Sequence, residues 1–127
     1  VDCNDSVFLA PESMCSAVRE RAGALTDGQL LRCIYDSLAL CYKEALSAME
    51  AKFERKFETL NIIGGGSQDL FLNERTAEIA GVQVIAGPAE ATALGNLLVQ
   101  MVAAGELSDM QEGRECIKNS FPLRTYQ

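Results

Sequence analysis

The feature that most constrains the fold is an alternation of short apolar runs with helical patterns across residues 59–104. The run Thr59–Ile63 ends at three glycines, and a helical pattern follows as far as Gly81. A second run, Val82–Ala86, precedes another helical pattern at about residues 90–104. Runs of this kind are typical of strands buried in a parallel sheet, and a helical crossover joins such strands. The pattern predicts a helix-rich α/β fold built on a parallel βαβ unit with flanking helices.

Two helices are predicted before this unit. Pro11 is expected in the first turn of a short helix that ends near Ala22, because a proline there loses no hydrogen bond. Thr26 and Gln29 have the spacing of a capping box, in which each side chain binds the other residue's backbone N–H group. The box predicts the start of a long helix with an apolar first half and a charged second half.

Serines are expected to cap two later helices. Ser67 follows the glycines and is predicted as the N-cap of the crossover helix, which Gly81 would close in a left-handed conformation. The segment Ser108–Gln111 has the form of a second capping box and predicts a last helix that stops near Asn119.

Two strands are too few for a free-standing parallel sheet, because its faces and edges need cover. Either further strands precede Val1 in a longer parent chain, or a second copy covers the missing edge by self-association. The chain begins without Met and an extended segment starts near Arg124, so we expect a fragment.

Charge and composition exclude several classes of function. The net charge is −7, and the 11 Lys and Arg residues form no cluster, which argues against nucleic-acid and anionic-membrane partners. The absence of histidine excludes histidine acid–base catalysis, a Ser-His-Asp triad and imidazole metal sites. No apolar stretch reaches the roughly 20 residues needed to cross a bilayer, and no signal peptide is recognisable. We therefore expect a cytoplasmic protein.

The cysteines agree with a reducing compartment. Their number is odd and no C-x-x-C spacing occurs, which fits neither a disulfide framework nor a zinc site. The five are Cys3, Cys15, Cys33, Cys41 and Cys116.

The turn Gly64–Ser67 is the candidate phosphate site. Glycines between a buried strand and a helix let the backbone approach a ligand closely, with the N–H groups of Gly65, Gly66 and Ser67 directed at an anion. The turn matches neither G-x-G-x-x-G nor a Walker-type Gly-Lys-Ser/Thr motif, so a tight turn without a ligand stays open as an interpretation.

The loop Gly87–Gly95 follows the second strand at the same edge, where open α/β sheets bind ligands. Within it, Glu90 either contacts a metal-bound water or places a negative charge at a helix N-terminus. Gly95 is expected to permit close helix packing.

The segments Asn61–Asn73 and Val84–Asn96 resemble the C-terminal domain of the FGGY carbohydrate kinases. The helix Leu31–Leu40 resembles the signature helix of that family, and Asn119–Leu123 resembles a late segment. The resemblance covers nearly the whole chain. Within the family, Gly87–Asn96 favours the branch that acts on L-rhamnulose over the glycerol and xylulose kinases.

This resemblance implies that residues 1–127 are part of the C-terminal nucleotide-binding domain of a sugar kinase, with a partial actin-like, ribonuclease-H-like ATPase fold. It implies transfer of the γ-phosphoryl group of ATP, with Mg²⁺, to the 1-hydroxyl of L-rhamnulose. Gly65 stands at the ATP-binding glycine of the family, and Gly64, Gly66 and Ser67 shape its loop. Several members have an Asn that faces the adenosine where this chain has Asp69, so no base or ribose contact is assigned to Asp69, and it receives no catalytic role.

In the family, the catalytic Asp, the sugar contacts and a first phosphate loop lie in segments before Val1. We therefore assign no catalytic residue and no metal ligand within this chain, and we expect it to be inactive alone. The sugar would be bound mainly by the N-terminal domain, and ATP or ADP by this part.

Two other functions compete with this interpretation. One is a free-standing nucleotide-binding or assembly module of the same fold without kinase activity. The other, a dinucleotide-binding redox domain, is disfavoured because no acidic residue stands about 20 residues after the glycine turn at the end of a second strand.

Overall fold

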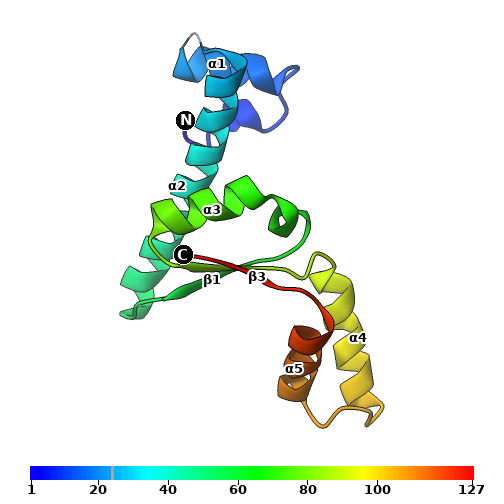
Figure 1. The fold of residues 1–127 in the computed structure, drawn as a ribbon. Helices are drawn as coiled ribbons and strands as arrows, with labels where there is room; N and C mark the ends of the chain where they lie inside the picture. The colour runs from blue at the N-terminus through cyan, green and yellow to red at the C-terminus, as the bar shows by residue number, and fades with distance from the viewer. Residues whose placement is uncertain (24) are drawn as a thin grey trace.

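The computed structural model describes residues 1–23 and 25–127. The sheet is layered against α3, which in turn packs against the long helix α2, while α4 and α5 form a hairpin that extends away from the sheet (Figure 1). In chain order the elements are η1 (Ser6–Phe8), α1 (Met14–Ala22), α2 (Asp27–Phe53), β1 (Thr59–Ile62), η2 (Gly65–Gln68), α3 (Leu70–Ala80), β2 (Gln83–Ala86), α4 (Ala91–Ala103), α5 (Met110–Ser120) and β3 (Arg124–Tyr126). The helix-rich α/β fold expected from the sequence is confirmed.

The sheet has the strand order β1-β2-β3. Strands β1 and β2 are parallel, with Leu60 opposite Val84, so the predicted βαβ unit is confirmed. Strand β3 runs antiparallel to β2, with Tyr126 opposite Val84. The second edge of β2 is thus covered by the chain's own C-terminal strand. Self-association through a sheet edge stays a prediction, and in the described part of the chain it concerns the outer edges of β1 and β3.

One part of the core lies between the sheet and α3, and another between α3 and α2. Val84 of β2 is fully buried, and Ala86 is 3% exposed. Because side chains alternate along a strand, these two residues share one face of the sheet. Leu72 and Ala77 of α3 are also buried. This packing fixes α3 along one face of the sheet, so that the segment before α3 lies at the carboxyl ends of β1 and β2.

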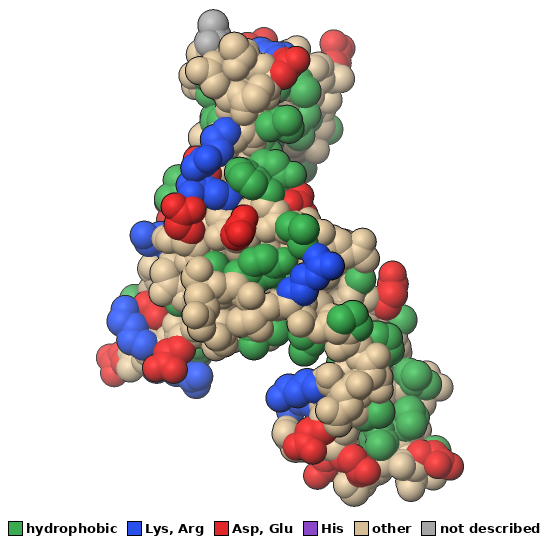
Figure 2. Space-filling model, in the orientation of Figure 1, with side chains coloured by type: hydrophobic (Ala, Val, Ile, Leu, Met, Phe, Trp, Pro, Cys, Tyr) green, Lys and Arg blue, Asp and Glu red, His purple; other side chains and the backbone are tan. Residues whose placement is uncertain are grey.

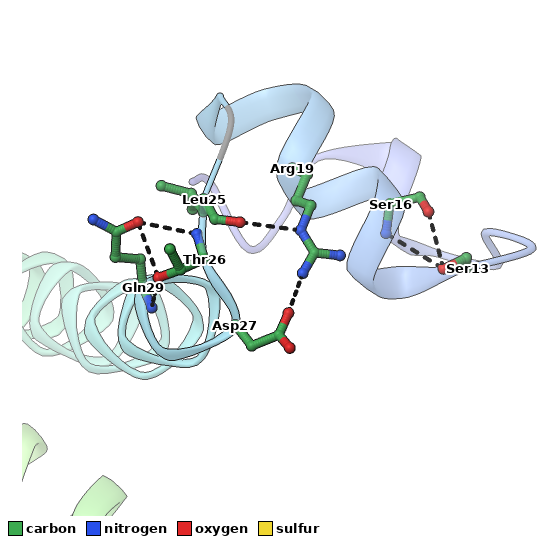
Figure 3. Close-up of polar contacts among 7 residues, drawn as sticks. All are labelled: Ser13, Ser16, Arg19, Leu25, Thr26, Asp27 and Gln29. Carbon is green, nitrogen blue, oxygen red and sulfur yellow. Dashed lines mark hydrogen bonds and ion pairs between the residues drawn. The ribbon is translucent and has the colours of Figure 1, made fainter.

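The capping box at the start of α2 is confirmed. Thr26 Oγ1 accepts the N–H of Gln29, and Gln29 Oε1 accepts the N–H of Thr26 (Figure 3). The start predicted for α1 is wrong. Ser13 Oγ accepts the N–H of Ser16, so α1 begins after Ser13 and Pro11 lies outside it.

The N-caps predicted for α3 and α5 are also wrong. Asp69, not Ser67, caps α3, and its Oδ1 atom lies 3.0 Å from the Leu72 nitrogen. Ser67 belongs to η2, where its hydroxyl donates to the Gly64 carbonyl. Asp109, not Ser108, caps α5. In both places a carboxylate one or two residues further along accepts the free N–H groups, as the helix dipole favours.

Close helix packing occurs at a glycine other than the predicted one. A Cβ atom added to Gly95 of α4 would have nothing within 4 Å. One added to Gly113 of α5 would lie 3.0 Å from the Leu98 side chain, which is 6% exposed. The two helices of the hairpin therefore meet at Leu98 and Gly113, because α5 faces α4 one turn beyond Gly95.

The outer side of the hairpin leaves apolar side chains uncovered. Leu97 is 51% and Val99 is 58% exposed, and apolar surface is visible along α4 in Figure 2. Even so, none of the helices in the described ranges combines the length and apolar character required of a membrane span.

Candidate functional site

The carboxyl ends of β1 and β2 bring the two predicted loops together. Gly64, after β1, donates its N–H to the Pro88 carbonyl at 3.3 Å. Gly87, after β2, donates its N–H to the Ile62 carbonyl at 2.9 Å. The glycine turn and the Gly87–Pro88 loop are thus held side by side by two backbone hydrogen bonds, at the edge where parallel sheets bind ligands.

The glycine turn has a backbone that only glycine adopts readily. Gly64 has φ 74° and ψ −160°, a region that other residues occupy only under strain. The chain then enters the short 3₁₀ helix η2. Ser67 is 6% exposed, and its N–H and hydroxyl both bind the Gly64 carbonyl, at 3.1 and 2.7 Å. The predicted direction of the Ser67 N–H is therefore wrong, because this group closes the turn.

Gly65 and Gly66 offer the N–H groups of the turn that remain available. Neither N–H donates to another group within residues 1–23 and 25–127. Gly65 is exposed, and a Cβ atom there would have nothing within 4 Å, so its backbone is open to a ligand. Unpaired N–H groups in a turn can bind an anion such as a phosphate.

A hollow of about 480 Å³ opens between the two loops and the chain before β3. This volume is within the range of small-molecule sites. Arg124 contributes a cationic side chain to its wall, where it could attract a phosphate. The full lining is Ser67, Gln68, Ala86, Gly87, Pro88, Ala89, Phe121, Pro122 and Arg124.

The sequence did not identify Phe121 and Arg124 as site residues. Phe121 entered only as part of the late segment Asn119–Leu123, without a role at the site. Arg124 reaches the site because β3 pairs with β2, where Arg124 stands opposite Ala86. That pairing is a long-range contact without a local signal.

Asp69 serves as an anchor of the turn. Its Oδ1 accepts the Leu72 N–H, and its Oδ2 accepts the Tyr35 hydroxyl of α2 at 2.7 Å. The Leu72 N–H and then the Tyr35 hydroxyl stabilise the charged carboxylate and lower the pKa of Asp69. Both carboxylate oxygens are engaged in holding α3 and α2.

Glu90 stands at the N-cap position of α4, but its side chain makes no capping hydrogen bond. A negative charge near a helix N-terminus is favourable even without that bond. Across the residues that the structure describes, no group of three or more Cys, Asp or Glu side chains is placed to hold a metal ion.

The lowered pKa of Asp69 predicts an acid-sensitive contribution to stability. This contribution is present above the pKa that Asp69 has when unfolded, and it is lost as the pH falls through the lower folded-state pKa. We expect the Asp69→Asn variant to be less stable than the unchanged chain at pH 7 by about 1 kcal/mol or less, since the site is half-exposed.

Urea unfolding at pH 7 and at pH 3 checks this expectation, because the difference between the two proteins should shrink in acid. Glu90→Gln provides the control, as Glu90 makes no capping bond. A difference that is the same at both pH values would contradict the role assigned to the Asp69 charge.

A strand-turn-helix unit with free glycine N–H groups beside a ligand-sized hollow defines a candidate nucleotide-binding domain. Residues 6–104 match the C-terminal domain of the FGGY family of carbohydrate kinases, and the chain belongs to this family. The resemblance noted in the sequence is thereby confirmed.

Similar proteins include rhamnulokinases from three bacteria. Those of Enterococcus faecalis, Bacillus subtilis and Bacteroides thetaiotaomicron are 48%, 43% and 41% identical to the chain. The matches cover 100%, 99% and 99% of the chain, respectively. The chain spans only 27% of the length of each of these relatives.

Proposed function

We propose that this chain is the ATP-binding part of a cytoplasmic carbohydrate kinase that converts L-rhamnulose to L-rhamnulose 1-phosphate in rhamnose catabolism. Support comes from the family match and from the rhamnulokinases that align with the whole chain. In this proposal residues 1–127 belong to the C-terminal nucleotide-binding domain of an actin-like, ribonuclease-H-like enzyme. An N-terminal domain supplies the sugar contacts and the catalytic base.

The observation that supports ATP binding most directly is the pair of free N–H groups at Gly65 and Gly66. They lie in the turn whose last residue, Ser67, lines the hollow, at the carboxyl edge of the parallel strands. In the proposal Gly65 contacts the nucleotide, Gly64 supplies the unusual backbone angle, and Gly66 and Ser67 complete the loop. Bound ATP supplies the phosphoryl group, while these residues bind and orient it.

Neutralising the phosphates and activating the sugar hydroxyl fall to the rest of the enzyme. Phosphoryl transfer depends on positioning and on neutralising the phosphate charge, usually with metal ions. The described residues of this chain offer no metal-ligand cluster, so Mg²⁺ and the base are proposed to act from the N-terminal domain. Closure of the two domains would assemble the complete site.

A hybrid kinase tests the proposal. Residues 1–127 would replace the matching 27% of the Enterococcus faecalis rhamnulokinase, and the hybrid should phosphorylate L-rhamnulose with ATP. Gly65→Val in this hybrid should raise KM for ATP by about tenfold, a loss of about 1.4 kcal/mol in nucleotide interaction. The fold should persist, because the side chain enters open space.

Gly28→Ala is the matched control, since a Cβ atom at Gly28 in α2 also meets nothing within 4 Å. It should leave KM for ATP unchanged. An inactive hybrid, or a Gly65→Val hybrid with an unaltered KM for ATP, would contradict the proposal. ADP binding by the 127-residue chain, together with an inactive hybrid, would instead support a nucleotide-binding or assembly module without kinase activity.

A further inference from the structure

Asn73 is a fully buried polar residue in the first turn of α3. Its Nδ2 atom donates a hydrogen bond to the Ser67 carbonyl at 3.0 Å, across six residues of chain. Its backbone N–H binds the Asp69 carbonyl within the helix. The side chain therefore reaches back from α3 to the glycine turn.

Burying the Asn73 amide destabilises the folded state, because its hydrogen bonding is incomplete. Asn73 is 0% exposed, and its Oδ1 atom has no hydrogen-bond partner among the described residues. A buried polar atom without a partner destabilises the folded state, and an apolar residue of similar size would avoid that cost. The feature that an apolar residue would lack is the bond to Ser67.

The bond from Asn73 engages the carbonyl group of Ser67. The N–H and hydroxyl of Ser67 both bind the Gly64 carbonyl, and its carbonyl accepts the Asn73 amide. All three polar groups of Ser67 are thus engaged. Because the peptide units from Gly64 to Ser67 are then held at both ends, the free N–H groups of Gly65 and Gly66 have a fixed direction.

We propose that Asn73 is a positioning residue for the nucleotide: through Ser67 it holds the Gly65 and Gly66 N–H groups in the direction that binds phosphate. This inference rests on the proposed function. Preorganised donors bind an anion more tightly than donors that must be ordered on binding. Asn73 itself touches neither nucleotide nor sugar in this account.

The test uses the hybrid kinase with Asn73→Leu, which keeps a similar volume and removes the amide. We expect KM for ATP to rise by about tenfold, while KM for L-rhamnulose stays within about twofold of the unchanged hybrid. Asn73→Ser, which is too short to reach Ser67 directly, is the second variant should the leucine variant fail to fold. It should shift KM for ATP in the same direction.

Thr76→Val is the matched control. Thr76 lies on the same helix, is also 0% exposed, and its hydroxyl donates to the Leu72 carbonyl at 2.7 Å without touching the turn. It should lower the melting temperature without a selective change in KM for ATP. If Thr76→Val and Asn73→Leu instead change both KM values alike, the role of Asn73 is structural only and the inference is overturned.

The result for Gly65→Val separates the two proposals. If Gly65→Val weakens ATP use while both Asn73 variants leave KM for ATP unaltered, only the positioning role fails. If Gly65→Val has no effect, the proposed nucleotide site itself fails, and the positioning role fails with it.

Discussion

Replacing Gly87 with alanine is expected to destabilise the chain by about 2–4 kcal/mol. Gly87 has φ 112°, a conformation that side chains with a Cβ atom adopt only under strain. The added Cβ atom would also lie 3.3 Å from the Pro122 carbonyl oxygen and 3.2 Å from the Leu123 side chain. The Pro122 contact is with backbone, so the neighbouring chain must shift before β3 can pair with β2.

Urea unfolding of the 127-residue chain measures this effect. Gly95→Ala is the matched control, because Gly95 lies inside α4 with nothing near its Cβ position. Alanine there should stabilise the helix by about 0.5–1 kcal/mol. A Gly87→Ala midpoint equal to that of the unchanged chain would show that the loop and β3 accommodate the methyl group without cost.

Gly64→Ala is expected to destabilise the chain by about 1–3 kcal/mol, for a different reason. The Cβ atom would lie 4.0 Å from the Ala89 carbonyl oxygen, an ordinary contact, so no overlap arises. The cost comes from the backbone, because φ 74° with ψ −160° is a region that only glycine occupies readily. A shifted backbone would also redirect the Gly65 and Gly66 N–H groups.

The neighbouring glycine supplies the control for this prediction. Gly65 has no positive φ, and its Cβ position is open, so Gly65→Ala should change stability by less than about 0.5 kcal/mol. The stabilities of the Gly64→Ala and Gly65→Ala variants, measured by thermal and urea unfolding, should therefore differ clearly. Equal stabilities would mean that the Gly64 conformation imposes no constraint on the turn.

These predictions depend on features that the sequence revealed to different degrees. The glycine turn and the second loop were both found from the residues, because a glycine run between a strand and a helix is a local signal. Their proximity followed from the parallel pairing. The structure confirms it through the hydrogen bonds of Gly64 and Gly87. Whether Gly65 binds ATP stays a prediction.

The sequence alone determined the elements whose signals are local. The apolar runs of β1 and β2, the Thr26 capping box and the left-handed closure of α3 at Gly81 all follow from residues within a few positions of one another. Hydrophobic period, capping chemistry and glycine freedom act over such short distances, so no knowledge of the packing is needed.

The tertiary structure decided what depends on partners far apart in the chain. Tyr35, 34 residues before Asp69, binds the carboxylate that caps α3. Strand β3 brings Arg124 to the hollow through its pairing with β2. Asn73 holds Ser67 only because α3 folds back over the turn. The sequence carries no local signal for such contacts, because they depend on how distant parts of the chain pack. The structure was therefore needed to show that the polar groups of Ser67 are engaged, whereas the N–H groups of Gly65 and Gly66 are free.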